Sequence, residues 1–540
     1  MKKQIALLLT LVLIVSLFAG CSKTESSAEA PKESSTEPAA ETPTESSAEE
    51  VKENPAEQSG SALRDTLVIG INSNPQSLSM SDTKMQNEML IGNALFDTLI
   101  YPADENGEFA PRLATSWEWE DDTHLVFHLR DDVYFHNGEK MTAEDVAFTI
   151  QTSCATKNNR SFFSAFDPEG TEAIDETTVR IAFQYPFAPA LAYLSASRGG
   201  IICKKAYEEL GADAYNLAPV GTGQFKFVSW TQSDSIVVER NDDYWDKDKV
   251  PSYKTIRFRI ITENSVRAME LEAGGIDIAF NLSANDFDRL KENPDLVAIV
   301  EDGLSHQGFQ LNSTTPELSD IRVREALCIS LDTEAIVKAV YGDYGTPASG
   351  LFSSNVFAFE ELGPYEYNPE RAKELLAEAG YEDGIDITMS IADITNLVKM
   401  AEIAQQQWKQ VGINLKIDIM EQVAVTELNA TGQTRITTTD YTTSTGDPGH
   451  SLQIYRSTWN GALQLKDSYI DEMLDKGLQE FDTEKRAEIY KELQEYIWNY
   501  YTCIPLVFTK NMVMHTAKIQ GLDLPESGYI LDYSSFDIYE

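Results

Sequence analysis

The chain of 540 residues is 42% hydrophobic and 10% aromatic, which is enough to build two or three sizeable lobes. Its 87 acidic and 43 basic residues give a formal net charge of −44 at pH 7, and a charge of this sign argues against nucleic-acid binding. The 5 cysteines lie far apart and show no CxxC spacing. Neither a zinc site nor a redox pair is therefore predicted, and disulfide pairing is left open.

The first predicted element is an export signal over residues 1–20. Lys2 and Lys3 precede a mostly apolar stretch that is too short for a membrane span. The stretch ends in Leu17-Phe18-Ala19-Gly20-Cys21, which resembles a bacterial lipobox, with Phe18 where that pattern prefers Leu. The resemblance implies that Cys21 is acylated and anchors the mature chain to the outer face of a bacterial cell membrane. A plain secretory signal followed by an ordinary cysteine is the alternative.

Residues 21–63 are predicted to be this cysteine followed by a disordered acidic linker. From Ser22 to Gly60 the chain consists almost entirely of Ser, Thr, Ala, Pro and Glu, and it has no aromatic residue with which to build a core. Glutamates recur at every fourth position from Glu25 to Glu49, where a helix would stack like charges on one face. We expect a solvated tether that lets a folded body stand off the membrane.

The body mixes strand and helix signals. Apolar runs or apolar–polar alternation predict strands at residues 66–71, 125–129, 179–183 and 256–260. Caps mark two helices, one after Thr142 and one from Asn368-Pro369 to Gly380. A third helix is predicted from about Asp482, with the apolar stripe Ile489, Leu493, Tyr496 and Ile497. This mixture predicts α/β lobes.

Several strings occur in a fixed order along the body. The longest begins Pro111-Arg-Leu-Ala-Thr-Ser-Trp117 and continues to Thr142-Ala-Glu-Asp-Val146. The others are Pro219-Val-Gly-Thr-Gly223, Glu239-Arg-Asn241, Leu271-Glu-Ala-Gly-Gly-Ile-Asp277, Val323-Arg-Glu-Ala-Leu327, Gly446-Asp447-Pro448 and Ile504-Pro505. Together they resemble the peptide/nickel-type (family 5) substrate-binding proteins of ABC importers, over essentially all of residues 64–540.

The resemblance implies a two-lobed, periplasmic-binding-protein-like α/β fold of class II, in the large peptide-binding subgroup with an extra subdomain in lobe I. Lobe I is expected at residues 64–308 plus 513–540, and lobe II at residues 309–512. A monomer of this kind captures a small ligand between closing lobes and delivers it to an ABC transporter permease. An oligopeptide or similar polar solute is the expected ligand. A metal chelate or an oligosaccharide, or a sensor role for the same fold, is the alternative.

Most of the strings are expected to be scaffold. Gly221 and Gly223 predict turns that residues with side chains adopt with difficulty, and Asn137-Gly138 predicts a hairpin turn. His136 and Trp117 are expected to be structural, because buried polar and aromatic residues are usually satisfied or packed.

Ligand contacts are expected after the strand that leads into Asp440-Tyr-Thr-Thr-Ser-Thr-Gly-Asp-Pro448. In peptide-binding members of the family, an Asp three residues after an aromatic pairs with the amino terminus of the peptide. Here the aromatic is Tyr441, followed by Thr442, and the Asp position holds Ser444. Either Asp440 or Asp447 replaces that Asp, or the ligand has no free amine there. Asp447 is alternatively a turn residue before a proline.

Further candidates come from the nickel-binding members. Arg160 and Arg198 lie near positions where those proteins hold chelate carboxylates with arginine, and His450 lies near their histidine ligand, shifted by one residue. Trp459 and Tyr441 are expected as pocket walls or as core, and Asn74 as a ligand contact or a turn former. No metal or cofactor is expected as a resident group. The chain has no HExxH, GxSxG or phosphate loop, so we expect a receptor and no enzyme.

Overall fold

The computed structural model describes residues 62–540 except residues 84, 105–106 and 525–529. The predicted signal at residues 1–20, the acylated Cys21 and the linker up to residue 61 lie outside the described residues. All described elements belong to one unit of the chain, residues 60–540. In the described part of the chain, no helix has both the length and the apolar character needed to cross a bilayer.

A mixed sheet of 11 strands is the centre of this unit. Its order is β13-β12-β14-β10-β15-β9-β1-β8-β7-β6, and β11 pairs with β15 beside this path. The strands are β1 (Thr66–Ile71), β6 (Phe225–Thr231), β7 (Ser235–Arg240), β8 (Thr255–Ile260), β9 (Ile278–Phe280), β10 (Leu296–Leu311), β11 (Gly345–Pro347), β12 (Ile385–Ala392), β13 (Ile413–Met420), β14 (Ile436–Thr442) and β15 (Cys503–Thr516).

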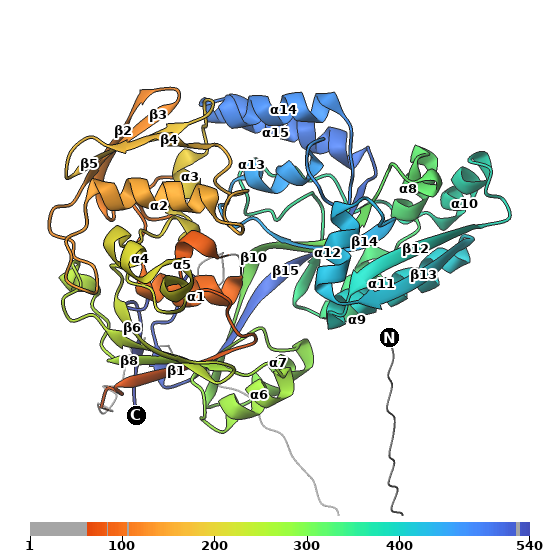
Figure 1. Cartoon of the computed structure of the whole chain (residues 1–540). Helices are drawn as coiled ribbons and strands as arrows, with labels where there is room; N and C mark the ends of the chain where they lie inside the picture. Colours follow the sequence, from red (N-terminus) through yellow and green to blue (C-terminus); the bar gives the residue numbers. More distant parts are fainter. Residues whose placement is uncertain (1–61, 84, 105–106, 525–529) are drawn as a thin grey trace, which may run out of the picture. The chain divides into compact units, whose positions relative to one another are not determined.

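The antiparallel strands β10 and β15 connect the two halves of this sheet (Figure 1). β10 pairs with β15 in both of its halves. The end of β15 that faces the first half of β10 also pairs with β9, and the second half of β10, Ser305–Leu311, also pairs with β14. The register shifts between Asp302 and Ser305, where the two halves meet. The predicted lobe boundaries at residues 308 and 513 fall inside these two strands, and we keep lobe I and lobe II as names for the two predicted parts.

Lobe I carries a second sheet of order β2-β3-β5-β4, inserted between β1 and β6. These strands are β2 (Ala114–Asp121), β3 (His124–Leu129), β4 (Phe166–Ala173) and β5 (Thr178–Phe183). The lobe I helices are α1 (Gln86–Leu95), α2 (Ala143–Ala155), α3 (Ala190–Ser195), α4 (Lys204–Leu210), α5 (Ala212–Leu217), α6 (Asn264–Glu272) and α7 (Ala284–Leu290). All four predicted strands are present, and Leu125 and Phe127 are fully buried as their alternation predicts.

Lobe II contains the remaining α-helices. They are α8 (Ile321–Ile329), α9 (Thr333–Tyr341), α10 (Pro369–Glu378), α11 (Thr395–Gln410), α12 (Gln422–Ala430), α13 (Pro448–Ser451), α14 (Ser468–Gln479) and α15 (Thr483–Trp498). The short elements of the two lobes together are β16 (Ile519–Gln520), β17 (Asp537–Ile538) and 3-10 helices at Met80–Asp82, Ser197–Gly199, Lys247–Lys249, Pro316–Leu318 and Leu452–Tyr455.

The two predicted helix caps, at Thr142 and Asn368, are confirmed, and the third predicted helix is also capped, by Asp482. The side chain of Asn368 accepts a hydrogen bond from the backbone N–H of Arg371 at 3.0 Å, and that of Asp482 accepts one from Lys485 at 3.1 Å. Thr142 and Asp145 form a capping box at the start of α2. The predicted stripe of α15 is wrong at Tyr496, which is 37% exposed because its hydroxyl donates to Asp467 at 2.9 Å at the surface.

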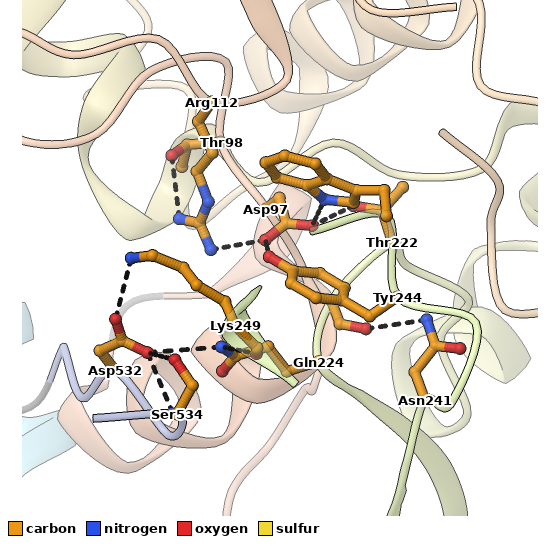
Figure 2. Close-up of polar contacts among 12 residues, drawn as sticks. Asp97, Thr98, Arg112, Thr222, Gln224, Asn241, Tyr244, Lys249, Asp532 and Ser534 are labelled. Carbon is orange, nitrogen blue, oxygen red and sulfur yellow. Dashed lines mark hydrogen bonds and ion pairs between the residues drawn. The ribbon is translucent and has the colours of Figure 1, made fainter. Parts of the chain in front are cut away.

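A buried carboxylate, Asp97, explains why several of the ordered strings are scaffold (Figure 2). It accepts hydrogen bonds from Arg112 at 2.5 Å, from the Tyr244 hydroxyl at 3.0 Å and from the Thr222 hydroxyl at 2.9 Å. The indole N–H of Trp245 donates to the same carboxylate at 3.0 Å. A buried charge is tolerated only when it is paired and hydrogen-bonded, so these strings are tied to one another by Asp97.

The glycines of the Pro219–Gly223 string are required for a reason other than the predicted one. Neither has a positive φ. Instead, a Cβ on Gly221 would lie 2.0 Å from the carbonyl oxygen of Leu95, and one on Gly223 would lie 2.5 Å from the Leu95 carbonyl carbon. The turn at Gly138 is confirmed, with φ of 85°.

His136 has the structural role that the sequence predicts. Its Nδ1 accepts a hydrogen bond from the Gly221 N–H at 3.3 Å, and its Nε2 donates to the Gly223 carbonyl at 3.1 Å. Burial lowers the pKa of His136 to about 4, so the ring is neutral at pH 7. Trp117 packs its ring 6.1 Å from that of Phe127. Among the described residues, the four cysteines are free thiols.

Candidate functional site

A polar cavity of about 580 Å³ lies between lobe I and lobe II beside β10 and β15. We call it the amide cavity, because nine carboxamide side chains line it: Asn72, Gln86, Asn87, Asn264, Asn281, Asn285, Gln307, Asn396 and Asn511. The loop after β1, α1 and the start of α7 supply the lobe I side, and α9, the start of α11 and β14 supply the lobe II side. Such a lining offers many neutral donors and acceptors to a small polar molecule.

Asp440 is the carboxylate of this lining. It lies on β14 opposite Gln307 of β10, and the Tyr341 hydroxyl donates to the Gln307 side-chain oxygen. Asp440 remains accessible to solvent, yet the surrounding protein raises its carboxyl pKa by desolvation, which the Gln307 side chain partly offsets by hydrogen bonding. It forms no ion pair with any residue that the structure describes.

Two lysines also line the amide cavity. The Lys510 ammonium is 3.2 Å from the Asp302 carboxylate, so its charge is paired within the protein. Lys399, at the start of α11, is exposed and takes part in none of the ion pairs among the described residues. The cavity thus holds one carboxylate and one ammonium without a charged partner in the described part of the chain.

A second cavity, also of about 580 Å³, adjoins the first. We call it the side cavity, and it shares Ile394 and Asp440 with the amide cavity. Its lining is more apolar and includes Met85, Leu397 and Val425. Asp440 therefore stands at the junction of a polar and a partly apolar compartment.

One edge of β14 is open beside this junction. On one side β14 pairs with β10 from Ile436 to Thr442, whereas on the other side it pairs with β12 at Ile436 alone. From Thr438 onward this second edge has no strand partner among the described residues. An open edge presents backbone N–H and C=O groups with which an extended peptide backbone can pair.

Three of the expected ligand residues lie together on the opposite face of β14. The ring of His450 is 6.0 Å from that of Tyr441, 5.2 Å from Phe162 and 6.0 Å from Tyr193. The Arg198 guanidinium lies 5.1 Å above the Phe162 ring. This group joins lobe I residues to lobe II residues, and we call it the aromatic junction.

Both ionisable rings of lobe II in the aromatic junction are held neutral. Burial, with a smaller contribution from Arg198, lowers the pKa of His450 to about 3. Burial also raises the pKa of the Tyr441 hydroxyl, and Arg198 opposes that rise. A neutral imidazole and a neutral phenol can each donate one hydrogen bond to a ligand.

His306 belongs to the same group, although the sequence offered no signal for it. It lies on β10 opposite Tyr441, with ring centroids 6.2 Å apart, and it is 1% exposed. Neither ring nitrogen has a hydrogen-bond partner among the described residues, and burial lowers its pKa to about 4. A single histidine between Ser305 and Gln307 carries no local pattern that distinguishes it from a surface residue.

The carboxylate of Asp447 is hydrogen-bonded to other residues of the protein. Its two carboxylate oxygens accept from the Arg486 guanidinium at 2.7 and 2.8 Å, and one of them also accepts from the Gly449 N–H at 2.8 Å as the cap of α13. The turn role that the sequence left open for Asp447 is therefore present. Between the two replacements considered for the missing carboxylate, only Asp440 faces a cavity.

The other expected residues are scattered. Thr442 shares a hydrogen bond of 2.6 Å with Ser305, and Ser444 is half-buried in the loop that follows. The Asn74 amide donates to Gln232 at 2.8 Å and accepts from the Ser233 N–H at 3.2 Å. Arg160 is exposed, and Trp459 is 36% exposed. None of the nine expected ligand residues lines either cavity.

Metal ligation has little support in this arrangement. Within residues 62–540, apart from the undescribed gaps, no three His, Cys, Asp or Glu side chains are grouped to hold a metal ion. His450 faces aromatic rings and Arg198, and a cation beside it disfavours a second positive charge.

The family model for bacterial extracellular solute-binding proteins, family 5 (middle region) matches residues 108–462, which is more than half of the chain. The chain belongs to this family. The glutathione-binding protein GsiB of Salmonella paratyphi A is 27% identical over 482 residues, covering 86% of this chain and 93% of that protein. GsiB of Escherichia coli K12 is 26% identical over 479 residues, with the same coverage of 86% and 93%.

Solved structures of binding proteins share the fold. DppA from Helicobacter pylori in complex with the peptide STSA superposes with a TM-score of 0.77 at 24% identity, covering 88% of this chain and 99% of that one. NikA from Brucella suis in complex with Fe(III)-EDTA gives 0.79 at 24% identity, covering 88% and 99%. These likenesses confirm the predicted two-lobed periplasmic-binding-protein fold. As a family 5 member, the chain is an extracytoplasmic solute-binding protein of an ABC importer, in keeping with a non-enzymatic role.

Proposed function

We propose that this family 5 protein is a membrane-anchored receptor that captures a short peptide or similar small polar solute between its lobes and passes it to an ABC permease. The observation that carries the proposal is the placement of Asp440, at the junction of two cavities and next to the open edge of β14. A peptide backbone can pair with that edge while its polar ends meet the amide cavity.

The two-strand connection supports capture by closure. Among the strands that the structure describes, only β10 and β15 run through both halves of the sheet, and the β10 register breaks between Asp302 and Ser305. Rotation about such a short connection opens and closes a cleft with little change inside either lobe. In the described structure the aromatic junction holds His450 of lobe II against Phe162 of lobe I, as in a closed receptor.

The expected ligand residues enter this proposal in two groups. Tyr441, His450 and Arg198 belong to the aromatic junction, which joins the lobes in this arrangement and would become accessible to a ligand only when the lobes open. Thr442 and Ser444 continue the chain from the open edge of β14. The remaining candidates, Asn74, Arg160, Asp447 and Trp459, have internal partners or exposed positions and are not needed for it.

Anchoring and delivery complete the proposal. The string ending in Cys21 supports an acylated N-terminus, and the acidic linker up to residue 63 supports a tether to the outer face of the membrane. We propose a monomer that meets its permease with both lobes closed on the ligand. The GsiB relatives support a glutathione-like or peptide cargo, because GsiB is named for glutathione binding.

The test is a titration of the protein purified without its first 20 residues, by calorimetry against tripeptides, glutathione, Fe(III)-EDTA and an oligosaccharide. We expect saturable binding of a peptide-like compound, which leaves the protein chemically unchanged. Binding of the chelate or the sugar alone would favour the alternative cargo, and chemical conversion of any compound would contradict a receptor. Native mass spectrometry of the purified protein identifies a ligand carried through purification.

A further inference from the structure

The side cavity presents a largely apolar wall to a ligand. Its apolar lining consists of Met85 from lobe I and of Ala392, Ile394, Leu397 and Val425 from lobe II. Val425 on α12 and Leu397 on α11 are each 3% exposed, so their side chains belong to the cavity wall and not to the outer surface. An apolar group that leaves water and packs against such a wall is stabilised by the hydrophobic effect.

Two carboxamides of the side cavity are bonded within lobe II. The Asn429 side-chain oxygen accepts a hydrogen bond from the Thr434 hydroxyl at 2.7 Å, and the Gln422 side-chain nitrogen donates to the Thr426 hydroxyl at 3.4 Å. Among the described residues that line this cavity, Asp440 alone has a charged side chain, and its carboxylate repels an acidic ligand group. The side cavity therefore suits an uncharged, apolar group, unlike the amide cavity beside it.

The open edge of β14 runs past this apolar wall. Thr438, Thr439 and Asp440 belong both to that edge and to the lining of the side cavity. A strand advances about 3.3 Å per residue, so the edge from Thr438 to Thr442 has room for about three residues of an extended peptide. Successive side chains of such a peptide point to opposite faces, so a residue that enters the side cavity has neighbours that point away from it.

We propose that the side cavity is a specificity site that takes one apolar side chain of a peptide ligand, of the size of leucine or phenylalanine. This inference rests on the proposed function and deepens it, because it names the peptides that the receptor prefers. Met85 belongs to lobe I and the other lining residues belong to lobe II, so closure of the lobes completes the wall around the side chain. A methionine adapts its shape to its neighbours, which suits a site for apolar side chains of more than one shape.

The experiment first asks the wild-type protein which position of a peptide it reads. Three series of tripeptides carry Gly, Leu, Phe, Glu or Lys at the first, second or third position and Ala at the other two, and calorimetry measures their affinities. We expect one position, and one only, at which Leu and Phe bind at least tenfold more tightly than Gly, which is about 1.4 kcal/mol. At that position Glu should bind more weakly than Gly, and Lys should bind more weakly than Leu.

A filled cavity then tests where this preference arises. Val425→Trp places a large ring in the side cavity, and we expect it to reduce the preference for Leu over Gly to less than threefold, while the affinity for the Gly peptide changes by less than threefold. The matched control is Val423→Trp, two residues earlier on α12, where the side chain is 78% exposed. It adds the same ring outside the cavity and should keep the tenfold preference.

The outcomes separate this inference from the proposed function. If wild type binds tripeptides with no preference at any position, or prefers Glu or Lys where an apolar side chain was expected, the apolar site is overturned while a peptide receptor stands. The same holds if Val425→Trp keeps the tenfold preference. If no tripeptide binds, the peptide cargo and the apolar site are both overturned. Should Val425→Trp not fold, Val425→Thr adds a hydroxyl to the wall at nearly the same shape and should lower the preference at least twofold, and the series on wild type needs no variant.

Discussion

Asp447 and Arg486 form a buried two-point ion pair that ties the start of α13 to α15, with both side chains at most 10% exposed. The pair is closed by further bonds: Arg486 donates to the Gly477 carbonyl at 2.8 Å and to the Tyr490 hydroxyl at 3.3 Å. We expect Asp447→Ala to lower the free energy of unfolding by about 3–5 kcal/mol, because it leaves an uncompensated buried guanidinium. Urea denaturation followed by circular dichroism measures this loss.

The matched control for this prediction is an exposed ion pair. Glu176 is 2.7 Å from Lys140 with a side chain 62% exposed, and Glu176→Ala should cost less than about 1 kcal/mol. The sequence alone left a ligand role open for Asp447. If Asp447→Ala lost ligand affinity but kept the stability of wild type, this result would support a ligand role for Asp447 and contradict its structural role.

The close approach of Gly223 to the Leu95 backbone gives a second prediction. A Cβ there would lie 2.5 Å from a backbone carbon, and backbone yields less easily than the end of a side chain. We expect Gly223→Ala to cost about 3 kcal/mol or more as overpacking, because the added Cβ meets backbone atoms. Gly138→Ala meets nothing within 4 Å and should cost only the strain of its φ of 85°, roughly 1–2 kcal/mol. Equal losses for the two variants, measured by thermal unfolding, would contradict the packing explanation.

The elements that depend on neighbouring residues were predictable from the sequence. A cap such as Asn368 bonds to a backbone N–H three residues away, and strand alternation such as Leu125 and Phe127 reports one buried face, so both signals lie within a short window. The fold as a whole came from the resemblance of the ordered strings to a known family. The partners of Asp97 lie between 15 and 148 residues away, which no local pattern reveals.

The candidate site was predictable only in part. Sequence reasoning reached the β14 segment and named both Asp440 and Asp447, but it could not choose between them. The choice depends on Arg486, which lies 39 residues after Asp447 and occupies its carboxylate. The amide cavity was missed altogether, because it gathers asparagines from Asn72 to Asn511 that carry no common motif.

Three histidines with lowered pKa values predict how stability depends on pH. Burial lowers the pKa of His136 and His306 to about 4 and that of His450 to about 3, against 6.5 in the unfolded chain. Between about pH 6.5 and pH 4 the unfolded state therefore binds more protons, so stability is full above pH 6.5 and falls as the pH is lowered. Each histidine contributes a slope of about 1.4 kcal/mol per pH unit in that range.

His306→Phe isolates one of these contributions. The difference in unfolding free energy between variant and wild type should move in favour of the variant as the pH falls from 7 to 4.5, since Phe has no proton to bind. Carboxylates titrate alike in both proteins and cancel in the difference. A pH-independent difference for His306→Phe would mean that the imidazole of His306 has the same pKa in the folded and the unfolded protein.

A contact between the lobes lies away from both cavities. The Phe481 ring, in the turn between α14 and α15 of lobe II, packs edge-on against Trp119 of lobe I with centroids 5.0 Å apart. Next to it the Ala188 N–H of lobe I donates to the Leu478 carbonyl of lobe II at 2.8 Å, and the Leu478 side chain is buried in the lobe I core. These contacts exist only while the lobes are together, so they stabilise the closed arrangement without touching the ligand.

Phe481→Ala should therefore weaken ligand binding by roughly two- to tenfold, because the closed state becomes a smaller fraction of the population and apparent affinity scales with that fraction. Phe481 is 41% exposed, so its truncation should cost little in the stability of either lobe. Small-angle scattering of the ligand-free protein should show a larger radius of gyration than wild type, with the two converging at saturating ligand. Ile419→Ala, at an exposed apolar position on the edge strand β13, should change neither quantity. If Phe481→Ala bound ligand as tightly as wild type, the turn between α14 and α15 would have no part in closure.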